Sequence, residues 1–268
     1  GDVGNSSVIV ANGFPGTINT GGGGGGAGSY TSGNTGGTGG SGVVILRFAS
    51  TTTYSVTDIT VGNEFTENSG SDTVLVFKTG SGTINLTGSS VLGPKVGDLR
   101  TNEDQKSAGS ASAMEHYMST GWRVLTNDIP PSISYLIIAG GGAGGTSYSG
   151  GGGAGGYRTN YGGTSFPITK DTSYTVTVGA GGTTASLAAR NGEDSTFSSI
   201  TSSGGGAGGD AVTGSTQCPT GYAGISGGSG GGSGYNCAPA GGSGNSGGYT
   251  PVEGYNGGAG NESGSASG

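Results

Sequence analysis

The sequence predicts an all-β protein with little or no helix, in which short antiparallel strands stand beside packed, glycine-rich helices of polyproline II type in a repetitive, fibre-like architecture. Three observations predict this class. Glycine supplies 68 and proline 8 of the 268 residues, a density that suits neither helices nor ordinary sheets. The apolar residues gather in short islands bounded by turn-forming residues, as in strands joined by turns. Charged residues amount to only 9%, whereas disordered chains, the alternative for such a composition, pair low hydrophobicity with high charge.

The glycine blocks predict a lattice of polyglycine II helices. Collagen needs glycine at every third position, but the spacers break that phase, since Ser229 and Ser233 stand four apart. Segments without side chains can approach closely and pair their N–H and C=O groups laterally, as buried backbone requires. Ordering glycine costs much entropy, so many segments must assemble together. The stretch 135–157, a short apolar strand that runs into dense glycine, is the expected opening edge of a glycine-rich domain.

The expected strands divide the chain into three parts: 1–50, 51–134 and 135–268. The first part alternates glycine with Ser, Thr and Asn and ends in the apolar run GVVILRF, which predicts a buried strand. That run has few apolar neighbours in sequence, so it must pair with a distant strand. The second part has less glycine and predicts a small β module, with alternating stretches at 53–61, 73–79 and 83–87.

A hairpin is predicted within this second part. Alternation in MEHYM, residues 114–118, favours a strand that turns at 119–121 into a second strand at 122–125. A short helix over 111–118 is the alternative, which Gly109 and Gly121 disfavour.

Two resemblances bear on these parts. The pattern GDLR at 97–100, followed by Asn102, MEHYM, STGW and RVL, is similar to a short motif that recurs in phage tail-fibre and other virion proteins. The resemblance implies a structural element in which Trp122 packs in a small β layer as a core anchor.

The third part resembles the glycine-rich domain common in phage and environmental virion proteins. Its apolar strand and glycine block are followed by YTVTVGAGG at 174–182, by the GxxSxF pattern at 192–197 and by more glycine. Glycine-rich phage adhesins contain stacked polyglycine II helices, so the resemblance implies a lattice of such helices in this chain too. The family's domain closes with a strand of the type GxVIIRY, which is absent after Ser202. The matching strand, GVVILRF, lies at 42–48, ahead of the β module.

This displacement predicts that residues 135–268 open a glycine-rich domain that residues 1–50 of a neighbouring repeat or subunit complete. Such a heterologous contact does not close on itself and propagates a filament. The chain starts without Met and without a signal peptide, so it looks processed or excerpted. The expected function is therefore structural: a unit of an extracellular or virion filament whose partners are copies of itself.

Composition argues against several other classes. The net charge is −7 with no basic stripe, which disfavours nucleic acid as a partner. The apolar runs are far shorter than the roughly 20 residues of a membrane helix, so no membrane insertion is expected. Repeats of GxGxxG arise by chance in so glycine-rich a chain, and His116 is the only histidine. The protein is expected to be no enzyme and to need no cofactor and no metal.

Acidic residues offer a weak alternative to that expectation. Asp98, Glu103 and Asp104, and also Glu193 with Asp194, can in principle bind calcium, but neither group matches an EF-hand loop. Acids that serve turns are the commoner explanation.

Two cysteines, Cys218 and Cys237, flank a glycine-rich loop. A zinc site is not supported, because the chain has no CxxC spacing and no second histidine. The prediction is therefore a disulfide, and two buried or idle thiols are the alternative. Closing a loop of this length removes roughly 3 kcal/mol of unfolded-state entropy. A disulfide also implies an oxidising, extracellular setting.

Two further sets of residues are candidate surface sites. N-x-[ST] sequons make glycosylation possible at Asn5, Asn85 and Asn261. Tyrosines among the glycines can stack on sugar rings or simply separate glycine helices: Tyr222, Tyr235, Tyr249 and Tyr255. They support the alternative function, a phage-type receptor-binding adhesin that recognises a surface glycan or protein through glycine-rich loops.

Overall fold

The structure is a computed structural model of the whole chain. It describes residues 12–28, 34–50, 52–67, 72–87, 99–101, 114–118, 121–124, 132–169, 171–184, 190–210, 223–235 and 240–260. Strands and irregular segments account for these residues, which include no helix. Every described strand pair is antiparallel. The predicted all-β class is therefore confirmed for the described part of the chain.

The first sheet is built around the apolar run that the sequence singled out. Strand β1 (Val43–Ala49) lies between β4 (Asp72–Phe77) and β9 (Ser132–Ile138). The short strands at the sides of the sheet are β3 (Asn63–Glu67), β10 (Tyr157–Thr159) and β11 (Phe166–Pro167). Leu46 stands opposite Leu75 on one side and Tyr135 on the other. The distant partner expected for β1 is thus supplied from both sides.

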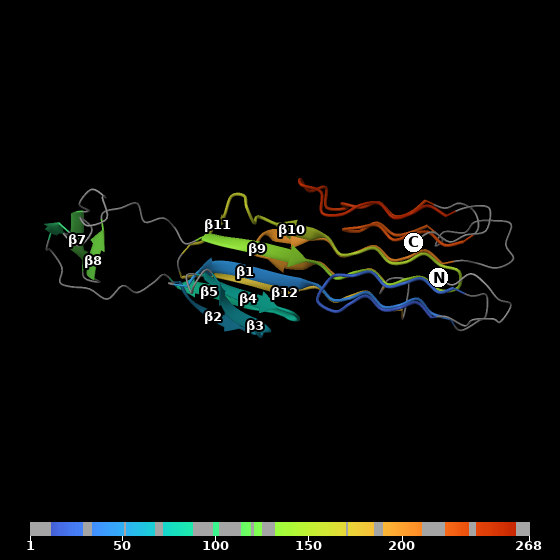
Figure 1. Cartoon of the computed structure of the whole chain (residues 1–268), viewed down its shortest axis with the longest axis horizontal. Helices are drawn as coiled ribbons and strands as arrows, with labels where there is room; N and C mark the ends of the chain where they lie inside the picture. The colour runs from blue at the N-terminus through green and yellow to red at the C-terminus, as the bar shows by residue number, and fades with distance from the viewer. Residues whose placement is uncertain are drawn as a thin grey trace.

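The second sheet covers the inner face of the first. Its strand order is β14 (Ile200–Ser202), β13 (Ser195–Phe197), β12 (Thr172–Val178), β5 (Gly80–Thr87) and β2 (Thr53–Thr57). Alternation sorts its side chains, so that hydroxyl-bearing residues such as Thr83 and Thr175 point outward while Ile84 and Val176 point inward. The two sheets form a sandwich (Figure 1) with one apolar core, which includes Val44, Leu46, Leu75, Phe77, Ile84, Leu86, Ile137, Val176 and Phe197.

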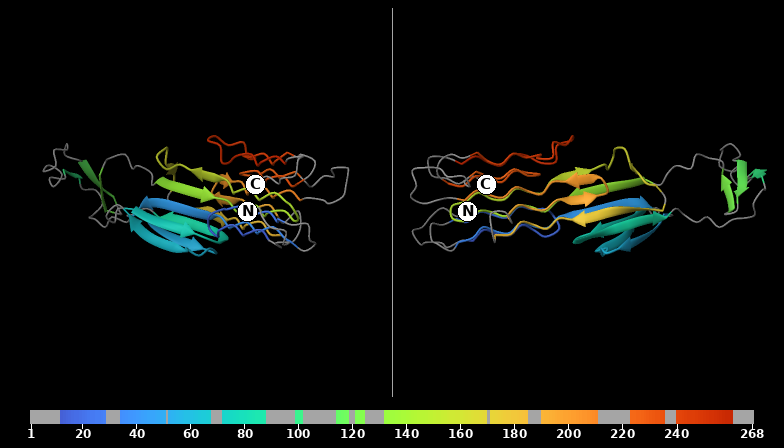
Figure 2. Two further views of the ribbon diagram at one scale, coloured as in Figure 1. Left: turned by 45° about the vertical axis from the view of Figure 1, so that its right-hand side comes forward. Right: turned by 180° about the vertical axis from the view of Figure 1, so that it is seen from behind.

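Glycine segments continue from the strands of the sandwich as a bundle. Segment 34–42 leads into β1, 139–145 leaves β9, 179–184 leaves β12 and 203–210 leaves β14. Figure 2 shows these wavy segments running side by side beyond the end of the sandwich. We call the set formed by 12–28, 34–42, 139–156, 179–184, 190–194, 203–210, 223–235 and 240–260 the glycine bundle. It extends the molecule along its longest axis.

Backbone hydrogen bonds hold the bundle together in three directions. The N–H groups of Gly140, Gly141 and Gly142 donate to the carbonyl groups of Glu193, Gly40 and Gly153, which belong to three different segments. The N–H of Ala143, three residues after Gly140, donates to Arg190 and so bonds segment 190–194 again. The carbonyl groups of the same four residues accept from Gly205, Gly182, Gly24 and Gly208. Segment 139–145 therefore bonds six neighbouring segments with a repeat of three residues. Because N–H and C=O groups point outward all round, each segment satisfies its backbone laterally, as buried backbone requires.

Glycine is required at these positions by the close approach of the segments. A Cβ added to Gly140 would lie 1.9 Å from the carbonyl oxygen of Ala180, and one added to Gly205 would lie 2.1 Å from that of Gly153. Such separations are far below van der Waals contact, so any side chain would force the segments apart.

The strand that closes the glycine-rich domain lies in the same chain as the strand that opens it. Residues 12–50 and 132–260 of one chain pack together: β1 pairs with β9, and segment 34–42 bonds 139–145. In this structure the domain is therefore completed within one chain, and its completion by a neighbouring repeat or subunit stays a prediction. Because β1 and β9 are antiparallel neighbours, the end of β1 at Ala49 and the start of β9 at Ser132 lie at the same end of the sandwich.

The middle part is not one separate β module either. Strands β2 to β5 belong to the sandwich, because β4 pairs with β1 and β5 pairs with β12. A third sheet holds β6 (Leu99–Thr101), β7 (Met114–Met118) and β8 (Gly121–Val124). Tyr117 stands opposite Trp122, which confirms the predicted hairpin; the packing of the Trp122 side chain stays a prediction. The described part of the chain has no helix with the length and apolar character of a membrane span.

Candidate binding groove on the glycine bundle

An open polar groove lies on the bundle beside the sandwich. Its cavity volume is about 390 Å³, within the usual range for ligand sites. Three neighbouring segments and one turn form the walls of this cavity, which we call the hairpin groove. Its lining residues are Asn191, Gly192, Asp194, Ser203, Gly204, Ser226, Gly227, Ser246, Gly247 and Tyr249. Most of this lining is polar, so the groove suits a ligand that forms hydrogen bonds.

The side chain of Asn245 fixes the loop that carries Tyr249. Its Oδ1 accepts hydrogen bonds from the backbone N–H of Tyr249 at 3.1 Å and of Glu253 at 3.3 Å, and its Nδ2 donates to the Tyr249 carbonyl at 3.1 Å. Asn245 itself has a φ of 51°, a left-handed conformation that asparagine tolerates better than most residues. The loop from 245 to 253 is therefore held by one short side chain.

Arg158 and Gly247 hold the ring of Tyr249 in place. The Arg158 guanidinium lies 3.9 Å from the ring centroid, a cation–π contact, and its Nη1 donates to the Thr201 carbonyl at 2.8 Å. A Cβ on Gly247 would lie 2.1 Å from Cε2 of the ring, so the ring rests directly on the glycine backbone. Tyr249 is half-buried and lines the groove with its position fixed.

A buried carboxylate lies behind this loop. Glu253 is 4% exposed, and its Oε2 accepts from the Ser203 N–H at 2.9 Å and from the Ser202 hydroxyl at 3.5 Å. Its Oε1 is buried and has no hydrogen-bond partner among the described residues. A Cβ on Gly156 would lie 2.4 Å from Oε2, so glycine there makes room for the carboxylate. Glu253 thereby joins the loop to the end of β14.

At the other wall of the groove, the side chains of two acidic residues and one asparagine accept hydrogen bonds from backbone N–H groups. Asp194 Oδ1 accepts from Gly204 N at 2.8 Å, Asn191 Oδ1 from Ala207 N at 2.9 Å, and Glu193 Oε2 from Ala180 N at 3.2 Å. The described residues contain no group of three or more His, Cys, Asp or Glu placed to hold a metal ion. Asp98, Glu103 and Asp104 lie outside the described residues. Glu193 and Asp194 thus act as acceptors for backbone N–H groups.

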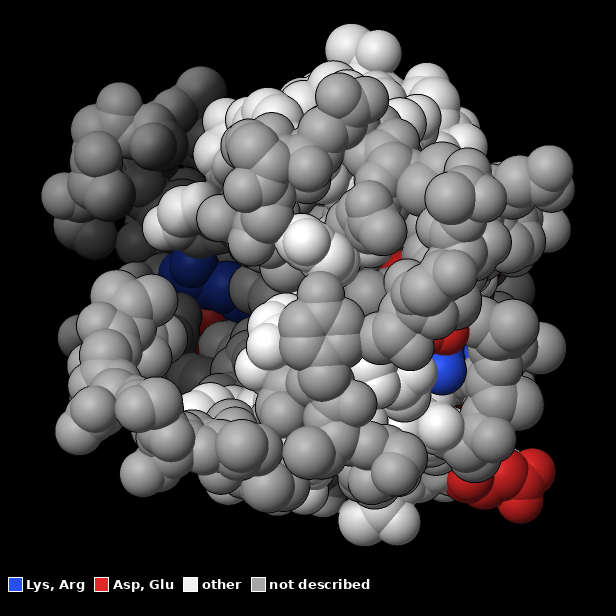
Figure 3. Space-filling model, turned by 90° about the vertical axis from the view of Figure 1, so that its right-hand side faces the viewer, with Lys and Arg blue, Asp and Glu red and all other residues white. Residues whose placement is uncertain are grey.

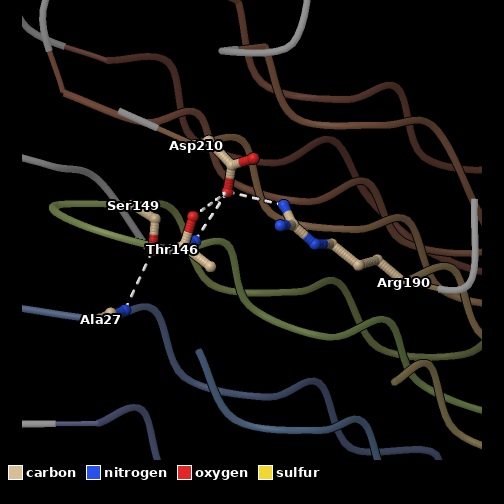
Figure 4. A network of polar contacts seen from close by, with 5 residues as sticks. All are labelled: Ala27, Thr146, Ser149, Arg190 and Asp210. Carbon is tan, nitrogen blue, oxygen red and sulfur yellow. Dashed lines mark hydrogen bonds and ion pairs between the residues drawn. The ribbon is translucent and has the colours of Figure 1, made fainter. Parts of the chain in front are cut away.

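A second polar cluster binds segments together at the end of the bundle away from the sandwich. Asp210 Oδ1 accepts from Arg190 Nη1 at 2.6 Å, from Thr146 N at 2.7 Å and from the Thr146 hydroxyl at 3.1 Å. Ser149 Oγ accepts from Ala27 N at 2.9 Å. Figure 4 shows Asp210 between Thr146 and Arg190, with Ser149 directed toward Ala27. Arg190 is buried, and its Nε has no partner among the described residues, so this cluster is structural.

The end-on view shows that few described charges lie at this end of the molecule. Acidic and basic atoms gather in only a few places in Figure 3, and the other described atoms belong to uncharged residues. The described part of this surface therefore offers little charge for attracting a strongly charged partner.

The predicted adhesive tyrosines do not form one surface. Tyr249 lines the groove, whereas Tyr235 packs against Tyr148 with ring centroids 5.9 Å apart. Tyr255 is 76% exposed on the last described segment. Tyr222 lies outside the described residues. Only Tyr249 joins a described cavity.

The other predicted sites gain little from the structure. Asn85 lies in β5 in the middle of the second sheet, and its Oδ1 is buried without a partner among the described residues. Asn5, Asn261, Cys218 and Cys237 lie outside the described residues, so glycosylation at these two sequons and the disulfide stay predictions. The side chain of His116 in β7 is likewise not described.

Sequence reasoning missed Asn245, Asn191 and Glu253. A signal for Asn245 was present, because asparagine followed by SGGYTP is typical of a turn. No local signal could identify Glu253, whose partners Ser202 and Ser203 lie about fifty residues earlier.

Comparison with protein families and proteins gives one result. A family model described as a glycine-rich domain matches residues 118–268, more than half of the chain. No curated protein and no solved structure matches. The matched range includes β9 to β14 and the later glycine segments, including every residue of the hairpin groove. The chain belongs to the glycine-rich domain family.

Proposed function

We propose that this protein is a non-enzymatic extracellular binding protein, an adhesin in which a rigid glycine bundle supports the binding surface. The observation that carries the proposal is the closure of the domain within one chain. Because β1 pairs with β9 and segment 34–42 bonds 139–145 in the same chain, a complete rigid unit exists without a neighbour. That unit carries an open polar groove on its side.

The bundle has the properties of a rigid support. We propose that its segments are polyglycine II helices, since their hydrogen bonds repeat every three residues, the repeat of the polyproline II conformation. Segment 139–145 bonds neighbours on all sides, so bending one segment would break bonds to several others. A surface held on such a lattice loses little conformational entropy when it binds a ligand.

An extracellular setting, on a virion or on a cell, belongs to the same proposal. The predicted disulfide between Cys218 and Cys237 would form only in an oxidising compartment. The resemblance of the glycine-rich part to virion proteins supports a phage-type fibre adhesin. The groove supports binding without chemistry, because Asp194 and Tyr249 are its only titratable lining side chains and the Asp194 Oδ1 already accepts from Gly204.

A structural filament is the second candidate function, and one observation favours it. The two outermost segments of the bundle, 12–18 and 252–260, lie on opposite sides of the molecule (Figure 1). Each exposes large apolar side chains: Phe14 and Ile18 on one side, Val252 and Tyr255 on the other. Copies that meet through these two sides would continue the bundle laterally, as heterologous contacts do.

Binding to intact cells and self-association separate the two functions. The adhesin proposal predicts a monomer in sedimentation velocity at all protein concentrations, together with saturable retention of fluorescently labelled protein on some members of a panel of bacterial cells. Filaments that lengthen with concentration in electron micrographs, and that a Phe14→Ser/Tyr255→Ser variant no longer forms, would instead establish the structural function.

A further inference from the structure

We infer that the hairpin groove binds a neutral saccharide. The inference rests on the proposed binding function and names the chemical class of its ligand. It depends on the hydrogen-bonding groups of the lining, on the charge of the groove and on the fixed position of Tyr249.

The lining offers donors and acceptors that the fold leaves available. Asp194 uses Oδ1 for Gly204 N, and its Oδ2 makes no hydrogen bond to a described residue. Asn191 uses Oδ1 for Ala207 N, which leaves its amide Nδ2 as a donor. Ser226 Oγ accepts from Ser243 N at 3.1 Å, so its own proton remains to be donated. A sugar hydroxyl both donates and accepts, and therefore matches such a mixed set.

The charge of the groove selects a neutral ligand. Asp194 is the only charged side chain in the lining. The guanidinium of Arg158 is not part of the lining; it lies over the Tyr249 ring and donates to the Thr201 carbonyl. An acidic sugar would meet the Asp194 carboxylate with no cation in the lining to offset the repulsion. Neutral hexoses and N-acetylhexosamines avoid that cost.

The polarity of the lining disfavours a peptide ligand. Peptide recognition depends on apolar pockets or on an unpaired strand edge, and the groove is lined by Ser, Asn, Asp and glycine with Tyr249 as its one aromatic side chain. An aromatic ring with a hydroxyl suits a sugar, which presents both an apolar C–H surface and hydroxyl groups.

Tyr249 is held before any ligand arrives. Asn245 fixes the Tyr249 backbone through two hydrogen bonds and the loop beyond it through a third, from the Glu253 N–H. Arg158 and Gly247 hold the Tyr249 ring. A side chain already fixed in its bound position costs no further ordering, so even a shallow groove gains affinity.

The test is binding of the full chain to an array of immobilised oligosaccharides, with neutral hexose and N-acetylhexosamine members beside sialylated and uronic-acid members. Asp194→Asn keeps Oδ1 as the acceptor for Gly204 and replaces Oδ2 by a donor. We expect binding to neutral members to weaken about ten- to a hundredfold, the range for loss of a hydrogen bond to a charged group. Asp171→Asn is the matched control, because Asp171 has the same charge, is exposed in a turn and lies outside the groove.

A second pair of variants tests the position of the ring. Gly247→Ala pushes the ring of Tyr249 aside without changing a polar group, and we expect binding to neutral members to fall at least tenfold. Gly163→Ala is its control, since a Cβ there would make only ordinary contact, at 3.5 Å from the Asn160 carbonyl oxygen. The circular dichroism spectrum and melting temperature of each variant are compared with those of the original chain, so that loss of folding is recognised.

The outcomes distinguish this inference from the proposed function. Binding to neutral members that Asp194→Asn and Gly247→Ala weaken, and that both controls retain, supports the inference. Retention on cells without binding to neutral members, or binding that neither groove variant weakens, overturns the inference and leaves the adhesin proposal in place. No retention on any cell and no binding to any array member overturns both.

Discussion

Gly142 illustrates what residue identity contributes to this fold. A Cβ at this position would lie 2.2 Å from the carbonyl oxygen of Gly206, in a bundle where the Gly142 N–H bonds Gly153 and its carbonyl accepts from Gly24. Alanine is tolerated only where a methyl group has room, as at Ala143 and Ala207, both of which are buried. The pattern of glycine and alanine is therefore set by the spacing of the segments.

The first prediction concerns this spacing. We expect Gly142→Ala to lower the free energy of unfolding by about 1–3 kcal/mol or more, the usual cost of overpacking. Gly28→Ala is the control in the same bundle, because no atom lies within 4 Å of a Cβ built there, and it should leave stability within about 1 kcal/mol of the original value. Urea denaturation measures both. Equal effects of the two substitutions would contradict the close packing.

The second prediction concerns Arg190, whose Nη1 donates to Asp210. We expect Arg190→Met to cost about 3 kcal/mol of unfolding free energy, since removing one partner of a buried ion pair leaves the other uncompensated. The double variant Arg190→Met/Asp210→Asn should recover part of that loss. A double-mutant cycle by chemical denaturation measures the coupling, and a coupling near zero would show that the pair contributes nothing.

The third prediction concerns Tyr54 in β2. Burial, followed by the hydrogen bond and the charge of Glu64, raises the pKa of the Tyr54 hydroxyl from 10.0 to about 12. Because the folded-state pKa exceeds the unfolded one, this contribution to stability is complete below pH 10 and is lost as the pH rises from 10 to 12. Tyr54→Phe should therefore lose less stability than the original chain over that interval. Denaturation midpoints at pH 9, 10 and 11 test this, and parallel curves would contradict it.

At the scale of elements, β1 decides how the domain closes. It lies between β4 and β9 of its own chain, although the sequence suggested a partner from a neighbouring repeat. Strand β1 lies about ninety residues before β9, and the strands between them include β2 to β5, which join the same two sheets. The long connection thus helps to build the sandwich that brings β1 to β9.

The fourth prediction tests this closure directly. Ile45 and Leu136 stand opposite one another in the β1–β9 pair, where Cα atoms lie about 4.5–5.5 Å apart, a separation that suits a disulfide. In Ile45→Cys/Leu136→Cys, we expect oxidation to link residues 45 and 136 within one chain. A non-reducing gel with peptide mapping detects the link, and the single variants are the controls. A ladder of linked oligomers would show closure between chains.

At the scale of the whole molecule, the sandwich positions the glycine bundle. Strands β1, β9, β10, β12, β13 and β14 are each contiguous with a glycine segment. The register of the strands therefore sets the register of the segments, and the two parts share one body (Figure 1). Glycine alone has no side-chain pattern to fix such a register.

The fifth prediction concerns this coupling. Leu46→Ala removes a fully buried side chain from the sandwich core, at a cost of about 2–5 kcal/mol. If the sandwich and the bundle unfold as one unit, hydrogen exchange at the amides of 140–143 should accelerate by the full loss of global stability. The amides of β1 serve as the internal reference. Unchanged protection in the bundle would mean that it folds independently.

Much of this architecture followed from local pattern. Alternation at 53–61, 73–79 and 83–87 predicted β2, β4 and β5, and apolar runs predicted β1 and β9. The hairpin of β7 and β8 followed from MEHYM and the glycine after it. Of the groove, Tyr249 was singled out as an adhesive residue and Asp194 only as a weak calcium candidate. The other lining residues come from segments distant in sequence, and serine, asparagine and glycine are too common in this chain to stand out.

The sequence by itself determined the class of the fold, because strand periodicity and glycine density are local properties of the chain. It also determined that 42–48 needed a distant partner. Only the tertiary structure decided that this partner is β9 of the same chain, that β2 to β5 belong to the sandwich, and that Asp194, Ser226 and Tyr249 share one groove. The physical reason is that strand pairing and the lateral bonds of glycine segments join residues far apart, and the repeated glycine motifs do not distinguish one partner from another.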